Sequence, residues 1–353
     1  MRMWAVVGAS VPLECLEEET PGPVGTEVLM EVTHCGVCHS DVHFWKGEYN
    51  LGKGKVMKVT ERSKLPRAPG HEVVGRVAAV GPDVTDVKIG DVRVIYPWIG
   101  CGHCPRCVAG QDNLCPNQSA IGVVRHGGFA SHVVVPHSRY LVDLGDLDPA
   151  LAATYACSGI TALSAVRKLG DVHPDSPVLI FGAGGLGLTA ITVLRALGHK
   201  NILVVDLDEA KRQSALDAGA YLAIDGASEM LVADIMSAAG VPLLYAIDFV
   251  NATSTATAAF DSLAHGGMLV LAGAAGGVLE LPLAPMIFKP RSVVGTKTGT
   301  VQDLKDVIAL AREGKLKPIP IERMAIDDAY EALQRLHHGQ VTGRVVLEHS
   351  CAH

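Results

Sequence analysis

The sequence lacks the features that mark three classes of protein. It contains no block of basic residues and has a formal net charge of -7, so nucleic acid is excluded as a partner. Its apolar runs are short and interrupted by glycine or charge, which predicts that no segment spans a bilayer. The N-terminal residues 1–7 include no long apolar stretch with a small-residue cleavage site. We therefore expect a soluble cytoplasmic protein with no membrane partner.

Charged residues are also scarce, at 19%, whereas hydrophobic residues make up 48% of the 353 positions. This balance excludes a disordered chain and supports a large packed core. The length suggests two domains. Nine cysteines stand out against this background. Because disulfides are rare in a reducing cytosol, clustered thiols there indicate metal binding or catalysis.

Four of these cysteines lie close together with the spacing C-x2-C-x2-C-x7-C: Cys101, Cys104, Cys107 and Cys115. Four thiolates can close a tetrahedron around zinc and leave no position open for chemistry. An iron–sulfur cluster is the alternative for four cysteines, but nothing else in the sequence requires it. We predict a structural zinc site, with His103 as a loop residue and not a ligand.

A second concentration of reactive side chains lies in residues 36–43. It places a thiol, two imidazoles, a hydroxyl and a carboxylate together: Cys38, His39, Ser40, Asp41 and His43. Any one of these residues alone is more often a packing or solvated residue. Their density suits a reaction centre better than a core or a surface face.

Two distant residues complete this group, His71 within Gly-His-Glu and Cys157 within Ala-Cys-Ser-Gly. A catalytic zinc usually takes three protein ligands and keeps one position open, and Cys38, His71 and Cys157 fill those three. Ser40 and His43 offer a route for a proton. Asp41 or Glu72 can orient a ligand imidazole or balance the zinc charge.

A glycine-rich motif lies further along the chain, at Gly182-Ala183-Gly184-Gly185-Leu186-Gly187. It directly follows the predicted strand 177–181 and opens the predicted helix 188–197, and Asp206 ends the next strand. This context is the dinucleotide-binding fingerprint. Asp206 can accept hydrogen bonds from ribose hydroxyls and would repel a 2′-phosphate, which favours NAD over NADP. Lys211 can approach the adenosine ribose or serve as a surface cation.

The predicted elements divide the chain. Residues 1–34 are β-rich, and strands at 70–81 and 92–96 indicate a partly closed β-barrel with His71 at the start of one strand. From about residue 151, strands and helices alternate as in a doubly wound parallel sheet. After about 290 the chain is expected to rejoin the first domain. The polar, lysine-rich segment 50–66 is predicted to be a surface loop, with a lid or subunit contact as the alternative.

Taken together, these motifs resemble the zinc-dependent alcohol dehydrogenases of the medium-chain dehydrogenase/reductase family. The resemblance covers nearly the whole chain. It implies an α/β protein with a GroES-like β-barrel catalytic domain, 1–152 completed by 293–353, and a Rossmann NAD-binding domain, 153–292. It also implies a homotetramer or a dimer.

The same resemblance assigns roles to individual residues. Catalytic zinc is bound by Cys38, His71 and Cys157, and structural zinc by the four clustered cysteines. Ser40 and His43 match the proton relay. Several positions match coenzyme contacts, namely His39 and Arg344 at the pyrophosphate, Thr161 near the nicotinamide, and Gly182, Gly184, Gly185, Gly187, Asp206 and Lys211 in the fingerprint. Trp45 and Trp98 match walls of the substrate pocket.

The expected activity is hydride transfer between a primary or secondary alcohol and NAD, which gives an aldehyde or ketone. Polyol dehydrogenases of this family use Glu where this chain has Cys157. Cinnamyl-type aldehyde reductases prefer NADP, against which Asp206 argues. A non-catalytic zinc and dinucleotide redox sensor is the alternative from another class. Segment 50–66 is longer and more basic than in compact relatives, which leaves substrate size open.

Overall fold

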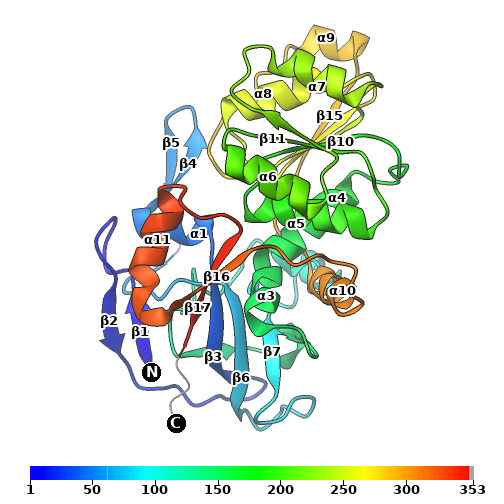
Figure 1. Ribbon diagram of the computed structural model, residues 1–353. Helices are drawn as coiled ribbons and strands as arrows, with labels where there is room; N and C mark the ends of the chain where they lie inside the picture. Colours follow the sequence, from blue (N-terminus) through cyan, green and yellow to red (C-terminus); the bar gives the residue numbers. More distant parts are fainter. Residues whose placement is uncertain (62, 350–353) are drawn as a thin grey trace.

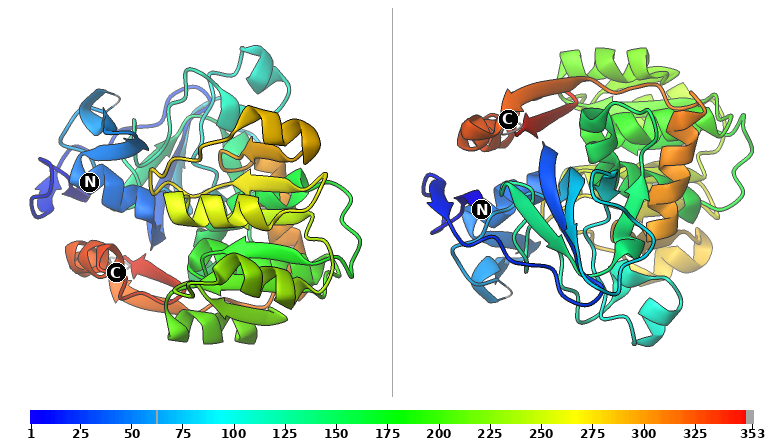
Figure 2. Two further views of the ribbon diagram at one scale, coloured as in Figure 1. Left: turned by 90° about the horizontal axis from the view of Figure 1, so that it is seen from above. Right: turned by 90° about the horizontal axis from the view of Figure 1, so that it is seen from below.

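The computed structural model describes residues 1–61 and 63–349 (Figure 1). The C-terminal tail, residues 350–353, was expected to be a frayed end and lies outside the described residues. Two large sheets organise the chain, one in each of two units. In both views of Figure 2 the blue N-terminal strands and the red C-terminal segment lie on the same side, away from the green and yellow second unit.

The first unit is built on a seven-stranded sheet with the strand order β16-β17-β3-β6-β7-β9, in which β8 also pairs with β3. These strands are β3 (Val28–Val37), β6 (Glu72–Val80), β7 (Val92–Ile95), β8 (His132–Val135), β9 (Leu141–Asp143), β16 (Ile321–Ala325) and β17 (Arg344–Glu348). A separate antiparallel pair is formed by β1 (Arg2–Ala5) and β2 (Glu14–Glu17). The C-terminal strands thus complete a sheet begun by the N-terminal ones.

The second unit is a six-stranded parallel sheet with the order β12-β11-β10-β13-β14-β15. Its strands are β10 (Val178–Phe181), β11 (Ile202–Asp206), β12 (Leu222–Asp225), β13 (Tyr245–Asp248), β14 (Met268–Leu271) and β15 (Ser292–Gly295). All four residues of β10 are buried, as expected for a central parallel strand covered on both faces. The strand order reverses between β10 and β13, which makes the carboxyl ends of these strands the expected ligand crevice.

Helices cover both faces of this sheet (Figure 1). One face carries α4 (Ile160–Lys168), α5 (Gly185–Ala196) and α6 (Glu209–Ala218), and the other carries α7 (Leu231–Ala239) and α8 (Thr253–Ser262). The predicted alternation of strands and helices is confirmed, with small shifts at element ends.

One domain boundary differs from expectation. The strand predicted at 293–296 was assigned to the first domain, but β15 pairs in parallel with β14. The parallel sheet therefore continues through Gly295. Helix α10 (Val301–Arg312) then packs against α4, and the chain returns to the first sheet through β16, α11 (Ala329–His337) and β17.

The lysine-rich segment is a β-hairpin, so the prediction of a loop is wrong. Strand β4 (Glu48–Gly52) pairs antiparallel with β5 (Lys55–Lys58), and a single 3-10 turn follows at Val59–Glu61. Lys53 and Gly54 at the tip both have positive φ angles, of 49° and 72°. A two-residue turn with two positive φ angles matches the right-handed twist of hairpin strands. Lysine at the first turn position hid this signal.

One helical run, Pro149–Lys168, is long and apolar enough to cross a membrane by length and composition, although none was expected. It joins α3 (Pro149–Thr154), a π-helical turn (Tyr155–Gly159) and α4. Of its most apolar window, 89% is buried inside the protein. Its apolar residues therefore serve the core between the two sheets.

Candidate active site and metal centres

Helix α1 (His39–Lys46) presents the first group of reactive side chains. It begins directly after β3, with Cys38 as its extended N-cap residue. Asp41, 2% exposed, accepts a hydrogen bond from the Cys38 amide at 2.9 Å through Oδ2. Its Oδ1 accepts from the Gly70 amide at 3.0 Å and lies 3.2 Å from His71 Nδ1. One buried carboxylate therefore fixes two distant segments against each other.

A cluster of four donor residues results. The side-chain donor atoms of Cys38, His71, Glu72 and Cys157 all lie within 4.8 Å of one another, and all four residues are buried. The two sulfur atoms are 3.9 Å apart. Thiolates bound tetrahedrally at about 2.3 Å from zinc lie about 3.8 Å apart, so the sulfur separation fits that ion.

The orientation of His71 fits the same ion. Because Asp41 engages Nδ1, the other nitrogen, Nε2, is left free to bind a metal. Nε2 is buried and has no hydrogen-bond partner in the described part of the chain. A buried nitrogen without a partner is costly unless another group occupies it. Cys38, His71 and Cys157 can therefore hold a zinc ion.

Cys157 reaches the cluster from a distorted helix. It lies in the π-helical turn Tyr155–Gly159, which inserts one residue into the run between α3 and α4. Such turns re-aim side chains and are frequent at functional sites. The Ser158 hydroxyl donates to the Thr154 carbonyl at 2.8 Å within this turn. Thr161 follows on α4 and is 5% exposed.

Glu72 faces a buried cation. Arg344 Nη2 lies 3.4 Å from Glu72 Oε1, and both residues are buried. Burial raises the pKa of Glu72 to about 7, while the Arg344 charge acts in the opposite direction. Glu72 pairs with Gly36 across the sheet, where any Cβ would lie 2.1 Å from Glu72 Oε2. Glycine at position 36 is therefore required for this carboxylate to fit.

The two cysteines polarise each other. The hydrogen bond with Cys157 lowers the pKa of Cys38, and His71 and Arg344 lower it further. The same bond raises the pKa of Cys157. Of the two thiols, Cys38 is therefore the one whose surroundings favour loss of its proton.

The glycine-rich loop has the geometry predicted for it. Gly182, directly after β10, has a φ angle of +93°, and Gly184 is the N-cap residue of α5. A Cβ at Gly187 would lie 1.8 Å from the Gly182 carbonyl oxygen, so only glycine permits this helix to pack on the strand. A Cβ at Gly185 would meet Arg344 Nε at 2.4 Å. Arg344 therefore connects the cysteine-containing cluster with the start of α5.

Asp206 is held beside this loop at the carboxyl end of β11. Its Oδ2 accepts from the Ala183 amide at 2.7 Å, and its Oδ1 accepts from the Asp208 amide at 3.0 Å. Lys211 follows in the first turn of α6, where its amide donates to Asp208 at 3.0 Å. The carboxylate is thus fixed where an adenosine ribose is expected.

Basic side chains gather near the start of α5. Burial lowers the pKa of His39, and the charges of Arg344, His43 and Lys211 lower it further. Arg344 comes from the first unit and meets the start of α5 at Gly185, whereas Lys211 belongs to the second unit. A helix N-terminus already favours anions, and this arrangement can bind a diphosphate.

Ser40 and His43 lie one turn apart on α1. The His43 ring packs on Tyr49, with ring centres 5.0 Å apart, and Tyr49 donates to the Ser40 carbonyl at 3.1 Å. Burial lowers the pKa of His43. In the described residues no direct hydrogen bond joins the Ser40 hydroxyl to His43. Tyr49 was not predicted as a site residue, because it directly precedes segment 50–66, which was predicted to be a surface loop.

The two tryptophans differ in position. Trp98 is 9% exposed, and its ring centre lies 5.3 Å from that of His71. Trp45 instead donates from Nε1 to the Val11 carbonyl and packs against Tyr330 and His337 of α11. The prediction that Trp45 lines the pocket is therefore wrong; it packs α1 against α11.

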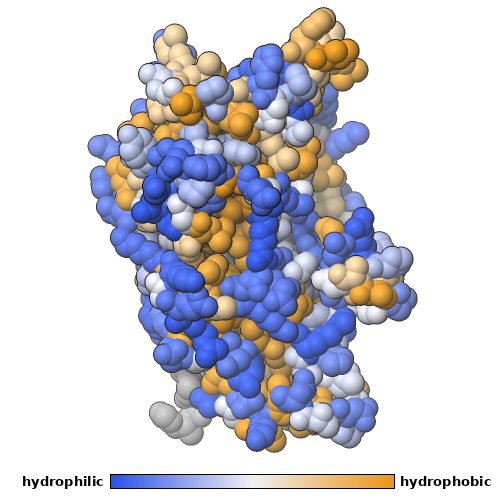
Figure 3. Space-filling model, turned by 90° about the vertical axis from the view of Figure 1, so that its right-hand side faces the viewer, coloured by the Kyte–Doolittle hydropathy of each residue, from blue (hydrophilic) through white to orange (hydrophobic). Residues whose placement is uncertain are grey.

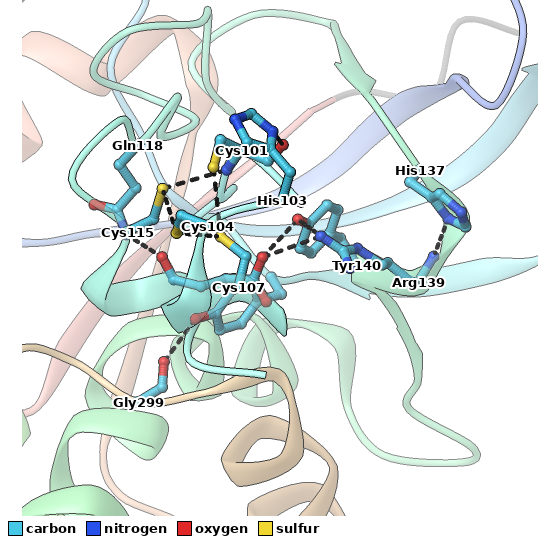
Figure 4. A network of polar contacts seen from close by, with 12 residues as sticks. Cys101, His103, Cys104, Cys107, Cys115, Gln118, His137, Arg139, Tyr140 and Gly299 are labelled. Atoms are coloured by element: carbon cyan, nitrogen blue, oxygen red, sulfur yellow. Dashed lines mark hydrogen bonds and ion pairs between the residues drawn. The ribbon is translucent and has the colours of Figure 1, made fainter. Parts of the chain in front are cut away.

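The four remaining clustered cysteines form a second group (Figure 4). Their sulfur atoms lie within 4.8 Å of one another, with pairs at 3.5 Å and 3.9 Å. The Cys101 amide also donates to the Cys115 sulfur at 3.3 Å, as amides around a bound thiolate do. His103 Nδ1 lies 2.9 Å from the Cys101 carbonyl oxygen, so this ring is engaged outside the four sulfurs. The set can hold one zinc with no open position.

This lobe is anchored to both units. Asp112, which is 3% exposed, accepts from Tyr140 at 2.9 Å and from Arg139 at 3.1 Å (Figure 4). Asn113 donates from Nδ2 to the Lys297 carbonyl at 2.8 Å, just after β15. Closing the lobe around an ion would therefore stabilise the contact between the units.

Comparison with known proteins matches this architecture. Residues 25–146 match the family model described as "Alcohol dehydrogenase GroES-like domain", and residues 185–313 match "Zinc-binding dehydrogenase". The NAD-dependent alcohol dehydrogenase of Saccharolobus solfataricus is 34% identical over 98% of this chain and 99% of its own. The chain belongs to the zinc-type alcohol dehydrogenases of the medium-chain dehydrogenase/reductase family. The predicted family and fold class are confirmed.

Two further relatives show the range of this family. The D-arabinose 1-dehydrogenase (NADP(+)) of Saccharolobus solfataricus is 33% identical over 96% of this chain and 95% of its own. The crystal structure of the alcohol dehydrogenase from Aeropyrum pernix is 29% identical, with a TM-score of 0.89 over 99% of this chain and 100% of that one. The protein is therefore an alcohol oxidoreductase that acts on small molecules. The chain is similarly identical to a relative named as NAD-dependent and to one named for NADP(+). Overall identity therefore does not determine the coenzyme, which depends on individual residues.

Proposed function

We propose that the protein is an NAD-dependent alcohol dehydrogenase that interconverts a primary or secondary alcohol and the matching aldehyde or ketone. It would carry one catalytic and one structural zinc ion. The observation that supports this best is the unpartnered Nε2 of His71, buried beside two sulfur atoms at a tetrahedral spacing.

Each residue of the cluster then has a task. Zinc would act as a Lewis acid on the alcohol oxygen, and NAD would accept the hydride. Cys38, His71 and Cys157 hold the ion, and Asp41 fixes the His71 ring with Nε2 toward it. Glu72, paired with Arg344, balances charge behind the cluster.

The alcohol proton needs a path out of the site. Ser40 Oγ would accept it, and the His43 ring, kept neutral near pH 7 by its lowered pKa, would pass it to solvent. Tyr49 holds both groups, through the ring contact with His43 and the hydrogen bond to the Ser40 carbonyl. Trp98 forms the wall beside His71.

Coenzyme binding would use the opposite side of the cleft. The amides at Gly184 and Gly185, with His39 and Arg344, receive the pyrophosphate. Asp206, supported by Lys211, binds the ribose hydroxyls and repels a 2′-phosphate, and Thr161 lies toward the nicotinamide. This assignment favours NAD and separates the chain from the NADP-dependent relative.

We also propose that the protein forms a homo-oligomer, a dimer or a tetramer. Helix α9 (Leu283–Phe288) exposes three large apolar side chains, Leu283, Ile287 and Phe288, by 79–81%. It directly precedes β15 in the chain, and β15 ends the sheet order, where it pairs with β14. Figure 3 shows apolar side chains at the top of the molecule, the end that carries α9 in Figure 1. An exposed sheet edge next to apolar surface favours pairing with a second copy.

We also propose a cytoplasmic location, because all eight cysteines in the described residues are free thiols.

The function is tested by incubating the purified protein with linear, cyclic and aromatic alcohols and each coenzyme, with zinc content measured in parallel. We expect NADH from several alcohols and two zinc ions per chain, one for each cluster. NADPH formed faster than NADH would point to an aldehyde reductase, and preference for D-arabinose to a polyol dehydrogenase. Two zinc ions with no alcohol oxidation would indicate the non-catalytic sensor.

A further inference from the structure

A cavity of about 340 Å³ lies between the β4–β5 hairpin of the first unit and the loops that follow β13 and β14 of the second. Tyr49, Leu51 and Met57 line it from the hairpin, and Leu271, Ala274 and Leu279 from the opposite side. Its volume is at the lower end of the range for small-molecule sites, roughly 300–1,000 Å³. The hairpin therefore forms one wall of a cavity between the two units.

The hairpin closes the outer end of this cavity by touching the loop after β14. A Cβ at Gly276 would lie 2.5 Å from Asn50 Cγ, and a Cβ at Gly52 would lie 3.1 Å from Val278 Cγ2. At the tip, Lys53 Nζ lies 3.8 Å from Glu280 Oε1. Both close approaches depend on glycine. The position of the hairpin therefore determines how far the cavity extends toward the loop after β14.

One residue of the hairpin, Tyr49, connects the cavity with the proposed proton path. Tyr49 lines the cavity and also contacts His43 and the Ser40 carbonyl. A substrate whose reacting carbon lies beside these residues would extend its substituent along the hairpin wall. Beyond Tyr49, the side chains of the hairpin have no task in the proposed chemistry, and those that line the cavity, among them Leu51 and Met57, are placed to contact that substituent.

The lining defines which substituent fits. Among the residues that the structure describes, no charged side chain lines the cavity, and the polar side chains that do are the phenol of Tyr49 and the amides of Asn50 and Asn251. Asn50 Oδ1 already accepts from the Gly52 amide at 2.9 Å, and Tyr49 already donates to Ser40. Hydroxyl groups of a sugar would lose water there with few partners, which is unfavourable.

We infer that the β4–β5 hairpin is the specificity-determining element of the site, and that it selects alcohols with a medium-length alkyl or an aromatic substituent over ethanol and over polyols. This inference rests on the proposed function and names its substrate class. Each methylene buried against the wall should raise kcat/KM by up to about fourfold, the factor that corresponds to about 0.8 kcal/mol.

The test compares kcat/KM for ethanol, butanol, hexanol, benzyl alcohol and D-arabinose. Met57→Trp narrows the cavity from the hairpin side, and Met57→Ala widens it. Val56→Trp is the matched control, because Val56 is the neighbouring residue, is 47% exposed and does not line the cavity. We expect wild type to prefer hexanol over ethanol at least tenfold and D-arabinose to be the poorest substrate. Met57→Trp should lower the hexanol-to-ethanol ratio at least tenfold, and Val56→Trp should leave it unchanged.

The outcomes separate this inference from the proposed function. Equal kcat/KM for ethanol and hexanol, or the same ratio in Met57→Trp as in wild type, overturns the role of the hairpin and leaves alcohol oxidation intact. Should Met57→Trp fail to fold, a larger relative gain for benzyl alcohol in Met57→Ala supports the inference, and no gain overturns it. Absence of NADH with every alcohol overturns both.

Discussion

Asp41→Asn is the substitution that most directly separates metal positioning from stability. The wild-type carboxylate accepts through Oδ1 from the Gly70 amide and His71, and through Oδ2 from the Cys38 amide. Asparagine has one oxygen and one NH2 group, so either orientation confronts at least one buried donor with another donor. Removing an acceptor from a buried amide costs about 1–3 kcal/mol.

The same change loosens the hold on His71. Substitution of a residue that orients a metal-binding histidine weakens metal affinity about 10- to 100-fold, or about 1.4–2.7 kcal/mol. We expect a chelator to remove the zinc ion at His71 from Asp41→Asn at a correspondingly lower concentration than from wild type. The zinc ion of the four-cysteine lobe should be retained. Zinc content at each chelator concentration and the thermal midpoint are measured on the same samples.

A matched control is available in Asp248. This carboxylate is also fully buried, and it accepts from the Val250 and Asn251 amides at 2.8 and 2.9 Å and from Thr255 Oγ1 at 2.7 Å. Asp248→Asn should lower the thermal midpoint to a similar degree without changing zinc affinity. Equal zinc affinity in the two variants would refute the positioning role of Asp41 and leave it a stabilising residue only.

Two further substitutions test other parts of the site, and a third tests a buried histidine outside it. Asp206→Gly should reduce the preference for NAD over NADP, and an unchanged ratio of kcat/KM values would contradict its ribose role. Cys104→Ser should remove one zinc ion and lower the thermal midpoint, and full zinc content would argue against the structural site. Burial lowers the pKa of His349 to about 4. The neutral ring therefore contributes stability above its unfolded pKa of about 6.5, which is lost as the pH falls toward 4, up to about 3 kcal/mol. In His349→Gln, the free energy of unfolding from urea titrations should fall less between about pH 7 and pH 5 than in wild type. An equal fall in both proteins would refute this prediction.

Short-range patterns in the sequence carried most of the site. Cys101, Cys104, Cys107 and Cys115 are close in sequence, so a short loop is enough to bring their four thiols together. The glycine loop is local as well, since the strand before Gly182 and the helix after it are both adjacent in sequence. The central strands of the parallel sheet are mostly apolar, so their alternation with helices could be predicted.

Long-range packing explains what could not be predicted. Trp45 and Tyr49 are both aromatic and close in sequence, yet Trp45 packs against α11 while Tyr49 lines the cavity. The position of α11 decides this, and α11 lies nearly 300 residues further along the chain. The Glu72–Arg344 pair depends on the pairing of β17 and β6 with β3. The β4–β5 hairpin was missed because its tip has Lys-Gly in place of Asn-Gly. Strand β15 is short and partly exposed, so nothing in its residues distinguishes one sheet from the other.

The proposed catalytic zinc ion is bound by Cys38, His71 and Cys157, which come from three separate segments of the chain. The most direct test of this claim is the zinc content and alcohol-dependent NADH formation of Cys38→Ser and Cys157→Ser, with circular dichroism to confirm the fold. We predict wild-type spectra, the loss of one zinc ion per chain and no measurable turnover in either variant. Two zinc ions and wild-type turnover in either variant would contradict the claim.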